Sequence, residues 1–229
     1  MTTADGPIAS IWTRPERSAV GRPAQWSRAG ITEVALRIAD ADGLEAVSMR
    51  RVAAELGTGA ASLYRYVETR EDLLDLMTDA TGAEYELAPP SGGWLADLVA
   101  FGEQARAIFR RHRWLAGLVM TRPVIGPNGI GLIEHFLTLL QGHPASIAAK
   151  MEAFGMLNGI TAAFALQEQA DPGLEARNLG YLGHALTSGG HPRLAALLSP
   201  QAQLPPPGEL ADRYPDLIAR VLTGLLGPA

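Results

Sequence analysis

The sequence contains no cysteine and only one lysine, Lys150. Without cysteine the chain can form no disulfide, thiolate nucleophile, cysteine-ligated zinc site or iron–sulfur cluster. The single lysine leaves 18 arginines among the 19 basic residues. Because 24 acidic residues outnumber them, the formal net charge is −5, which argues against a protein that binds nucleic acid over its whole surface.

Targeting and membrane segments are also missing from the pattern. The first thirty residues carry scattered charges and lack the apolar stretch of a secretory signal. The longest weakly polar run, residues 153–166, has 14 residues, whereas a membrane-spanning helix needs about 20. We therefore expect a soluble, cytoplasmic protein with no membrane partner.

Helical periodicity dominates what is present, and no convincing run alternates as a strand would, so we predict an all-α fold. Residues 1–26 form a basic lead that we expect to be flexible. A Pro- and Gly-rich break at residues 88–93 indicates a second domain. We assign residues 27–81 to a first helical domain and residues 82–229 to a second domain, a helical bundle.

Helix-start signals locate the elements. Ser27 and Ser48 stand at N-cap positions, and Thr69 with Asp72 forms a capping box. These signals and the apolar spacing predict helices that begin after Ser27 and end at 42, then at 49–56, 60–67, 69–85, 94–111, 114–121, 128–141, 146–169, 174–186 and 209–226, with one turn at 194–198.

Residues 47–67 have the pattern of a helix-turn-helix. Two short helices meet at Gly57, and Ala53 is small where the helices must approach closely. Small residues open the second helix, and we expect it to present a polar face to a DNA groove, including Tyr64, Arg65 and Tyr66. The alternative is an ordinary helical hairpin, because helix-turn-helix matches arise by chance. Two neighbouring tyrosines and the arginines at 50, 65 and 70 favour DNA binding.

The stretch GLEAVSMRRVAAELGTGAASLYRYVETREDLLDLM resembles the DNA-binding domain of the tetracycline-repressor (TetR) family of bacterial regulators. Its Leu-Tyr-x-Tyr-Val run, residues 63–67, is similar to the Leu-Tyr-x-His/Tyr-Val/Phe hallmark of that family. The resemblance covers residues 27–79 and implies operator contacts from Ser48, Arg50, Ala60, Ala61, Ser62, Tyr64, Tyr66 and Arg70. Both early positions of the recognition helix are alanine, so base reading would depend on Arg50, Arg65, thymine methyl contacts or DNA shape.

The basic lead has two interpretations. Residues 14–28 hold four arginines and one glutamate, and arginine-bearing arms enter the minor groove in other helix-turn-helix proteins. A solvated tail is an equal alternative. Residues 10–70 carry 9 arginines against 7 acids, so the DNA-binding part has a local charge of +2 despite the acidic chain.

Dimerisation is expected through two C-terminal helices. Residues 151–166 are apolar nearly all round, and Gly155, Gly159 and Ala163 would allow close helix approach. The last helix carries an apolar stripe from Leu210 to Leu225. We predict that both pair with their symmetry mates in a homodimer, as the family resemblance implies. A monomeric core is the alternative.

The C-terminal helices also predict a pocket for an unidentified small-molecule effector. Its candidate residues are Phe101, Arg106, Trp114, His135, Phe154, Asn158 and Phe164. Plain core packing is the commoner role for such residues. The histidines form no metal-ligating pattern, and no catalytic motif or cofactor site is apparent, so we expect no metal, no cofactor and no enzyme activity.

Together these features predict a repressor that leaves a palindromic operator when the effector binds. An activator or adaptor without effector is the alternative, and an enzyme on a helical scaffold is disfavoured.

Overall fold

The computed structural model describes residues 10–15, 26–187, 190–197 and 213–227. Every regular element among them is a helix, which confirms the all-α prediction. The elements are α1 (Arg28–Asp42), η1 (Leu44–Ala46), α2 (Met49–Glu55), α3 (Ala60–Leu63), α4 (Arg70–Gly82), α5 (Trp94–Arg111), α6 (Leu115–Thr121), α7 (Pro127–Leu139), α8 (Ile147–Glu168), α9 (Pro172–Thr187), α10 (Pro192–Leu197) and α12 (Tyr214–Leu226). No helix in the described ranges is long and apolar enough to cross a membrane.

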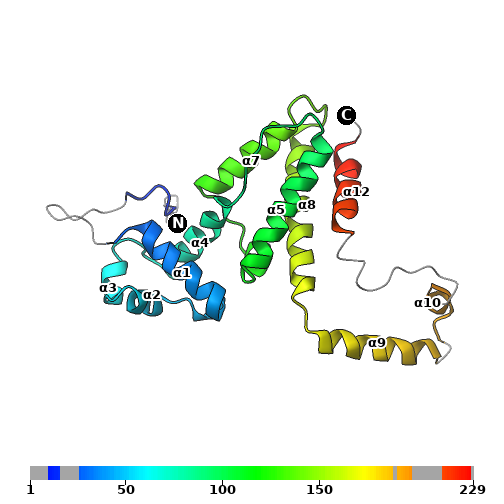
Figure 1. Ribbon diagram of the computed structural model, residues 1–229, viewed down its shortest axis with the longest axis horizontal. Coiled ribbons are helices and arrows are strands. Elements are labelled where there is room, and N and C mark those ends of the chain that lie inside the picture. The colour runs from blue at the N-terminus through cyan, green and yellow to red at the C-terminus, as the bar shows by residue number, and fades with distance from the viewer. Residues whose placement is uncertain (1–9, 16–25, 188–189, 198–212, 228–229) are drawn as a thin grey trace, which may run out of the picture.

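Helices α1 to α4 form a separate group at one end of the molecule (Figure 1). Their predicted caps are present: the Ser27 and Ser48 hydroxyls accept from the third backbone N–H of their helices, and Thr69 and Asp72 exchange both bonds of a capping box. Such caps contribute about 1 kcal/mol each. They fix where the short helices begin, although the helices are too short to be stable alone.

One hydrophobic core joins these four helices. Its fully buried members come from every helix of the group and from the turn before α4: Ile31, Ala35, Val52, Leu63, Val67, Leu73 and Met77. Helix α3 ends at Leu63 instead of continuing to Val67 as predicted. The chain turns there, with the N–H groups of Tyr66 and Val67 both donating to the Leu63 carbonyl. The bond from Val67 spans four residues, so Val67 lies on the same side as Leu63 and is buried with it.

Part of the N-terminal lead is folded against this core. Ile11 is only 1% exposed, and the Arg28 guanidinium donates to the carbonyls of Ile11 and Arg14 at 2.9 and 2.8 Å. Arg14 forms ion pairs with Glu68 and Asp72. The expectation of a flexible lead is therefore wrong for residues 10–15, because the Ile11 side chain is buried and its carbonyl is hydrogen-bonded. Residues 1–9 and 16–25 lie outside the described part of the chain.

The C-terminal domain is built around α8, which packs against α5, α6 and α12. Its core includes Phe136, Leu157 and Ile218, each at most 1% exposed. Tyr214 opens α12 and is fully buried, and its hydroxyl lies 2.6 Å from Thr161 Oγ1 on α8. Burial raises the pKa of Tyr214 to about 12, so the hydroxyl stays neutral.

Part of the apolar stripe of the last helix is used within the chain. Ile218 and Leu222 are fully buried, and the helix packs on α5 and α8. Leu217, Val221 and Leu225 of the same stripe are only half-buried, so the pairing of this helix with a symmetry mate stays a prediction. The helix is described from Tyr214, and the predicted residues 209–212 lie outside the described ranges.

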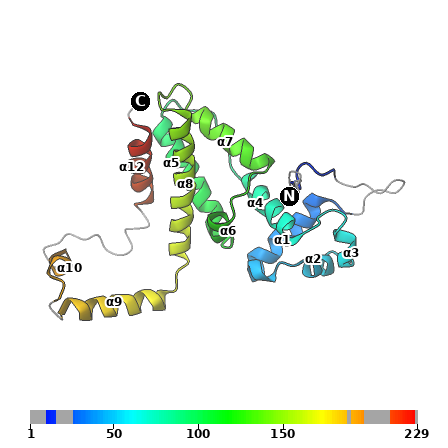
Figure 2. The same cartoon turned by 180° about the vertical axis from the view of Figure 1, so that it is seen from behind.

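Helix α9 extends away from the bundle, with α10 beyond it (Figures 1 and 2). Three large apolar residues of α9, Leu174, Leu179 and Tyr181, are 43%, 54% and 73% exposed. A monomer would leave this surface in water at a free-energy cost.

Candidate DNA-binding surface and ligand pocket

The turn between α2 and α3 is compact. Gly57 has φ +66°, a left-handed conformation that other residues rarely adopt, and the Thr58 N–H donates back to the Ala53 carbonyl at 2.9 Å. The turn directs the start of α3 outward. Ala61, Tyr64 and Arg65 are exposed, and Ala60 and Ser62 are half-buried.

Two exposed arginines on this surface are available for contacts with DNA. Within the described ranges, neither Arg50 nor Arg65 forms an ion pair, and both are exposed. Adjacent Arg51 differs, because it contacts Asp42 and Glu55, both at 3.2 Å. A guanidinium without a carboxylate partner can donate to phosphate or to a guanine edge without first breaking an ion pair.

Two of the predicted contact residues, Tyr66 and Arg70, are held by contacts within the domain. Tyr66 was expected to face outward but is 5% exposed, because it lies three residues after the buried Leu63 and packs on the same side. Arg70 donates to the carbonyls of Val47 and Leu44 at 3.1 and 3.2 Å. This pair of bonds joins the start of α4 to the helix-turn-helix, so a movement of α4 would be transmitted to it.

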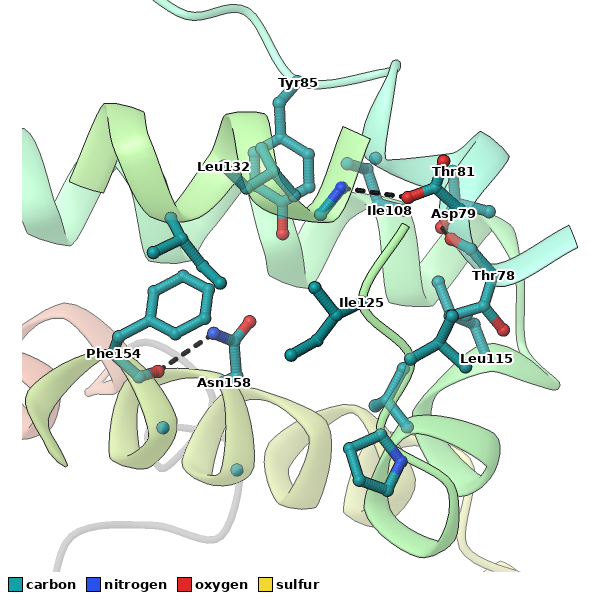
Figure 3. Close-up of a pocket in the computed structure, with 18 of the residues that line it drawn as sticks. Thr78, Asp79, Thr81, Tyr85, Ile108, Leu115, Ile125, Leu132, Phe154 and Asn158 are labelled. Carbon is teal, nitrogen blue, oxygen red and sulfur yellow. Dashed lines mark hydrogen bonds between the residues drawn. The ribbon is translucent and has the colours of Figure 1, made fainter. Parts of the chain in front are cut away.

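A cavity of about 600 Å³ lies between α4, α5, α6, α7 and α8 (Figure 3). This volume is in the range of small-molecule sites. Most of its lining is apolar and comes from all five helices and the loop before α7, including Ile108, Phe109, Leu115, Val119, Met120, Ile125, Leu132, Ile133, Met151 and Phe154. The polar side chains in the lining belong to Thr78, Asp79, Thr81, Tyr85 and Asn158.

Two of the seven predicted ligand residues, Phe154 and Asn158, line this cavity. The other five do not, and the hypothesis that they do is corrected. Arg106 pairs with Glu168 at 2.5 Å and lies 4.8 Å over the Tyr214 ring. The remaining four pack elsewhere: Phe101 in the second core near His135, Trp114 against Asp40, and Phe164 on Tyr214.

Sequence reasoning missed Asp79 and Tyr85. Asp79 is 7% exposed, and its carboxylate accepts from Gly129 N at 2.9 Å and from Asn128 N at 3.2 Å and Nδ2 at 3.1 Å. It therefore caps the first turn of α7 from α4, 49 residues away in sequence. Gly126 is needed beside it, because a Cβ there would lie 2.4 Å from Asp79 Oδ1. Asp79 lies inside a stretch with helical periodicity, and nothing in that local pattern indicates that it caps another helix.

A second link joins the two domains at His112, which is 5% exposed. Its Nδ1 lies 2.7 Å from Asp40 Oδ1 on α1, and its Nε2 lies 2.7 Å from Glu84 Oε1, just after α4. Trp114 Nε1 also donates to Asp40. With Asp79, this cluster places the pocket walls in direct contact with the DNA-binding helices.

No group of three or more His, Asp or Glu side chains within the described part of the chain could hold a metal ion.

Comparison with known proteins places this geometry in a family. Residues 31–77 match the model for bacterial regulatory proteins of the tetR family, and residues 88–205 match the tetracyclin repressor-like C-terminal domain. Over 213 residues the chain is 35% identical to the HTH-type transcriptional repressor DrrR1 of Streptomyces coeruleorubidus, which covers 86% of this chain and 79% of that protein.

Solved structures agree. Apo ActR from Streptomyces coelicolor superposes with a TM-score of 0.74 at 33% identity, over 88% of this chain and 95% of ActR. ActR in complex with actinorhodin gives 0.75 at 31% identity, over 89% and 96%. These relatives are regulators rather than enzymes, which confirms the expectation that the chain is not an enzyme. With a helix-turn-helix at one end of α4 and a cavity at the other, the chain belongs to the TetR family of DNA-binding transcription regulators.

Proposed function

We propose that this protein is a homodimeric repressor that leaves its operator when a small molecule enters the cavity. The observation that carries the proposal is the position of α4. Its first residue, Arg70, is bonded to the helix-turn-helix, and Thr78, Asp79, Thr81 and Gly82 near its end line the cavity. Any ligand that displaces the end of α4 also displaces its start.

The DNA contacts that we propose come from Ser48, Arg50, Ala60, Ala61, Ser62, Tyr64 and Arg65. Tyr66 is excluded because it is buried. Arg70 stays a candidate for a phosphate contact, because its two backbone bonds use Nε and Nη2 and leave Nη1 available. Acids on α4 do not oppose this surface strongly, since Asp72 pairs with Arg14 and Asp75 with Arg122. Arg14 is for the same reason an unsuitable minor-groove arm.

Members of the TetR family bind operator DNA as dimers, and two recognition helices about one DNA turn apart would read a palindrome. We propose that the dimer surface is the exposed apolar side of α8 together with α9. Met156 and Leu166 on α8 are 48% and 40% exposed, and α9, which follows α8 in the chain, also carries exposed apolar residues. A monomer in light scattering at micromolar concentration would contradict this.

Release of the operator follows from a population shift. An effector that binds more tightly when α4 is displaced lowers operator affinity by as much as its own affinity differs between the two states. ActR, which this chain resembles, has been solved with actinorhodin bound. The site of action of such a regulator is the cytoplasm, where its DNA is.

Selection of bound fragments from the source genome tests the proposal. We expect a palindrome near this gene or a neighbouring one, with occupancy that falls when the effector is added. A reporter whose transcription rises with the protein would favour the activator alternative, and occupancy indifferent to every extract of the source cells would favour an adaptor without effector.

A further inference from the structure

The lining of the cavity carries charge of one sign only. No arginine, lysine or histidine is among its residues, and its ionisable side chains are those of Asp79 and Tyr85. Basic residues on the surrounding helices are engaged elsewhere, as Arg110 is with Glu168 and Arg122 is with Asp75. A bound anion would therefore find no counter-ion in the lining, and burial of an unpaired charge is costly.

Asp79 makes the lining unfavourable to anions. Its carboxylate accepts three N–H bonds at the N-terminal end of α7. A second negative charge in the same apolar cavity would be repelled, and the repulsion is stronger there than in water.

The remaining polar groups offer neutral hydrogen bonds. Asn158 donates its Nδ2 to the Phe154 carbonyl at 2.9 Å, which leaves Oδ1 free to accept from a ligand (Figure 3). Burial raises the pKa of Tyr85, so its hydroxyl is uncharged. The rings of Tyr85, Phe109 and Phe154 supply flat apolar surface.

From these observations we infer that the effector is a ring-containing apolar molecule with a hydroxyl or amino donor and no negative charge, and that the pocket rejects its anionic analogues. This inference rests on the proposed function, because it assumes that the cavity is the effector site.

A matched pair of dyes tests it on the full-length protein. N-phenyl-1-naphthylamine is uncharged, and 8-anilinonaphthalene-1-sulfonate has the same ring system with an added sulfonate. We expect the neutral dye to bind at least about tenfold more tightly in fluorescence titrations.

Two variants locate the dye and reverse the preference. Gly159 lines the cavity, and a Cβ added there would have no atom within 4 Å. Gly159→Phe should therefore fill the cavity and abolish binding. Gly117 is equally open but lies outside the lining, so Gly117→Phe is the matched control. Ile125 lines the cavity and is 64% exposed, and Ile125→Lys should raise the affinity of the sulfonate about tenfold while leaving the neutral dye unchanged.

The outcomes separate the inference from the function. If the sulfonate binds as tightly as the neutral dye, and Gly159→Phe removes both, the pocket exists but the inference is overturned. If Gly159→Phe affects neither dye, the cavity does not take ring-containing ligands, and the proposed effector site is overturned as well.

Discussion

The two ends of α4 lie in contrasting surroundings. At its start, exposed arginines and a tyrosine project from short helices that local signals define. At its end, an apolar cavity is enclosed by five helices, with one buried carboxylate. The first surface suits an extended anionic partner and the second a small one without negative charge. One helix, capped at its start and bonded to α7 near its end, therefore connects a surface with exposed arginines to an apolar cavity.

The largest expected effect is on the core beneath the DNA-binding end. Leu63→Ala should lower the free energy of unfolding by about 2–5 kcal/mol, because Leu63 is fully buried and its loss leaves a cavity. Urea denaturation measures this. The adjacent Tyr64→Ala, at a side chain 49% exposed, should change stability by no more than about 0.5 kcal/mol. Equal losses would mean that α3 is not packed as described.

Operator affinity should distinguish Arg50 from Arg51. Arg50→Ala should weaken binding by about 1–3 kcal/mol per half-site, because we propose that its unpaired guanidinium contacts the DNA. Arg51→Ala is the control, because Arg51 is committed to Asp42 and Glu55. Gel-shift titrations at fixed salt measure both. A larger loss from Arg51→Ala would reverse the assignment of the DNA-facing side of α2.

The pocket end of α4 should depend on Asp79. Asp79→Ala leaves the N–H groups of Asn128 and Gly129 without their acceptor and should cost about 1–3 kcal/mol of stability. Asp75→Ala on the same helix removes only a partly exposed ion pair with Arg122 and should cost about 0–1 kcal/mol. Thermal or urea unfolding compares them. Equal losses of stability would show that the hydrogen bonds from α7 to Asp79 contribute no more than an exposed ion pair does.

The smallest effect concerns pH and the far side of the bundle. Bonds from Arg110 and then Arg106 lower the pKa of Glu168, against the opposing effect of burial. The unfolded chain therefore takes up a proton at higher pH than the folded one, so this contribution is complete above the ordinary carboxyl pKa and is lost as pH falls below it.

Urea unfolding of wild type and Glu168→Gln between pH 7 and pH 3 checks this sign. We expect a difference below about 1 kcal/mol that shrinks towards acid, because Glu168 is partly exposed. The exposed Glu134→Gln serves as the control. A difference that grows towards acid would contradict the lowered pKa.

Expectations based on neighbouring residues agreed with the structure. The caps at Ser27, Ser48 and Thr69 depend on contacts three residues apart, and all three are present. Expectations that required a side chain's surroundings fared worse. Tyr66 has the same polar aromatic character as Tyr64, yet Tyr66 is buried and Tyr64 is exposed, because only Tyr66 lies on the side of the buried Leu63.

The pocket shows the same limit over longer distances. Aromatic and polar residues at helical spacing, such as Phe101 and Arg106, were reasonable candidates, but their helix faces point to other neighbours. Asp79 was invisible because its partners are about fifty residues away in sequence. Ile11 could not be placed either, since its burial depends on bonds from Arg28 to nearby carbonyls.

The sequence by itself determined the helices, their starting points and the helix-turn-helix, because those depend on spacing, caps and turns within a few residues. Tertiary structure alone decided which tyrosine is buried, which residues line the cavity, and that α12 packs on α5 and α8 while α9 is left exposed. Those outcomes depend on how helices distant in sequence pack together, and burial and electrostatic pairing are properties of that packing rather than of any one segment.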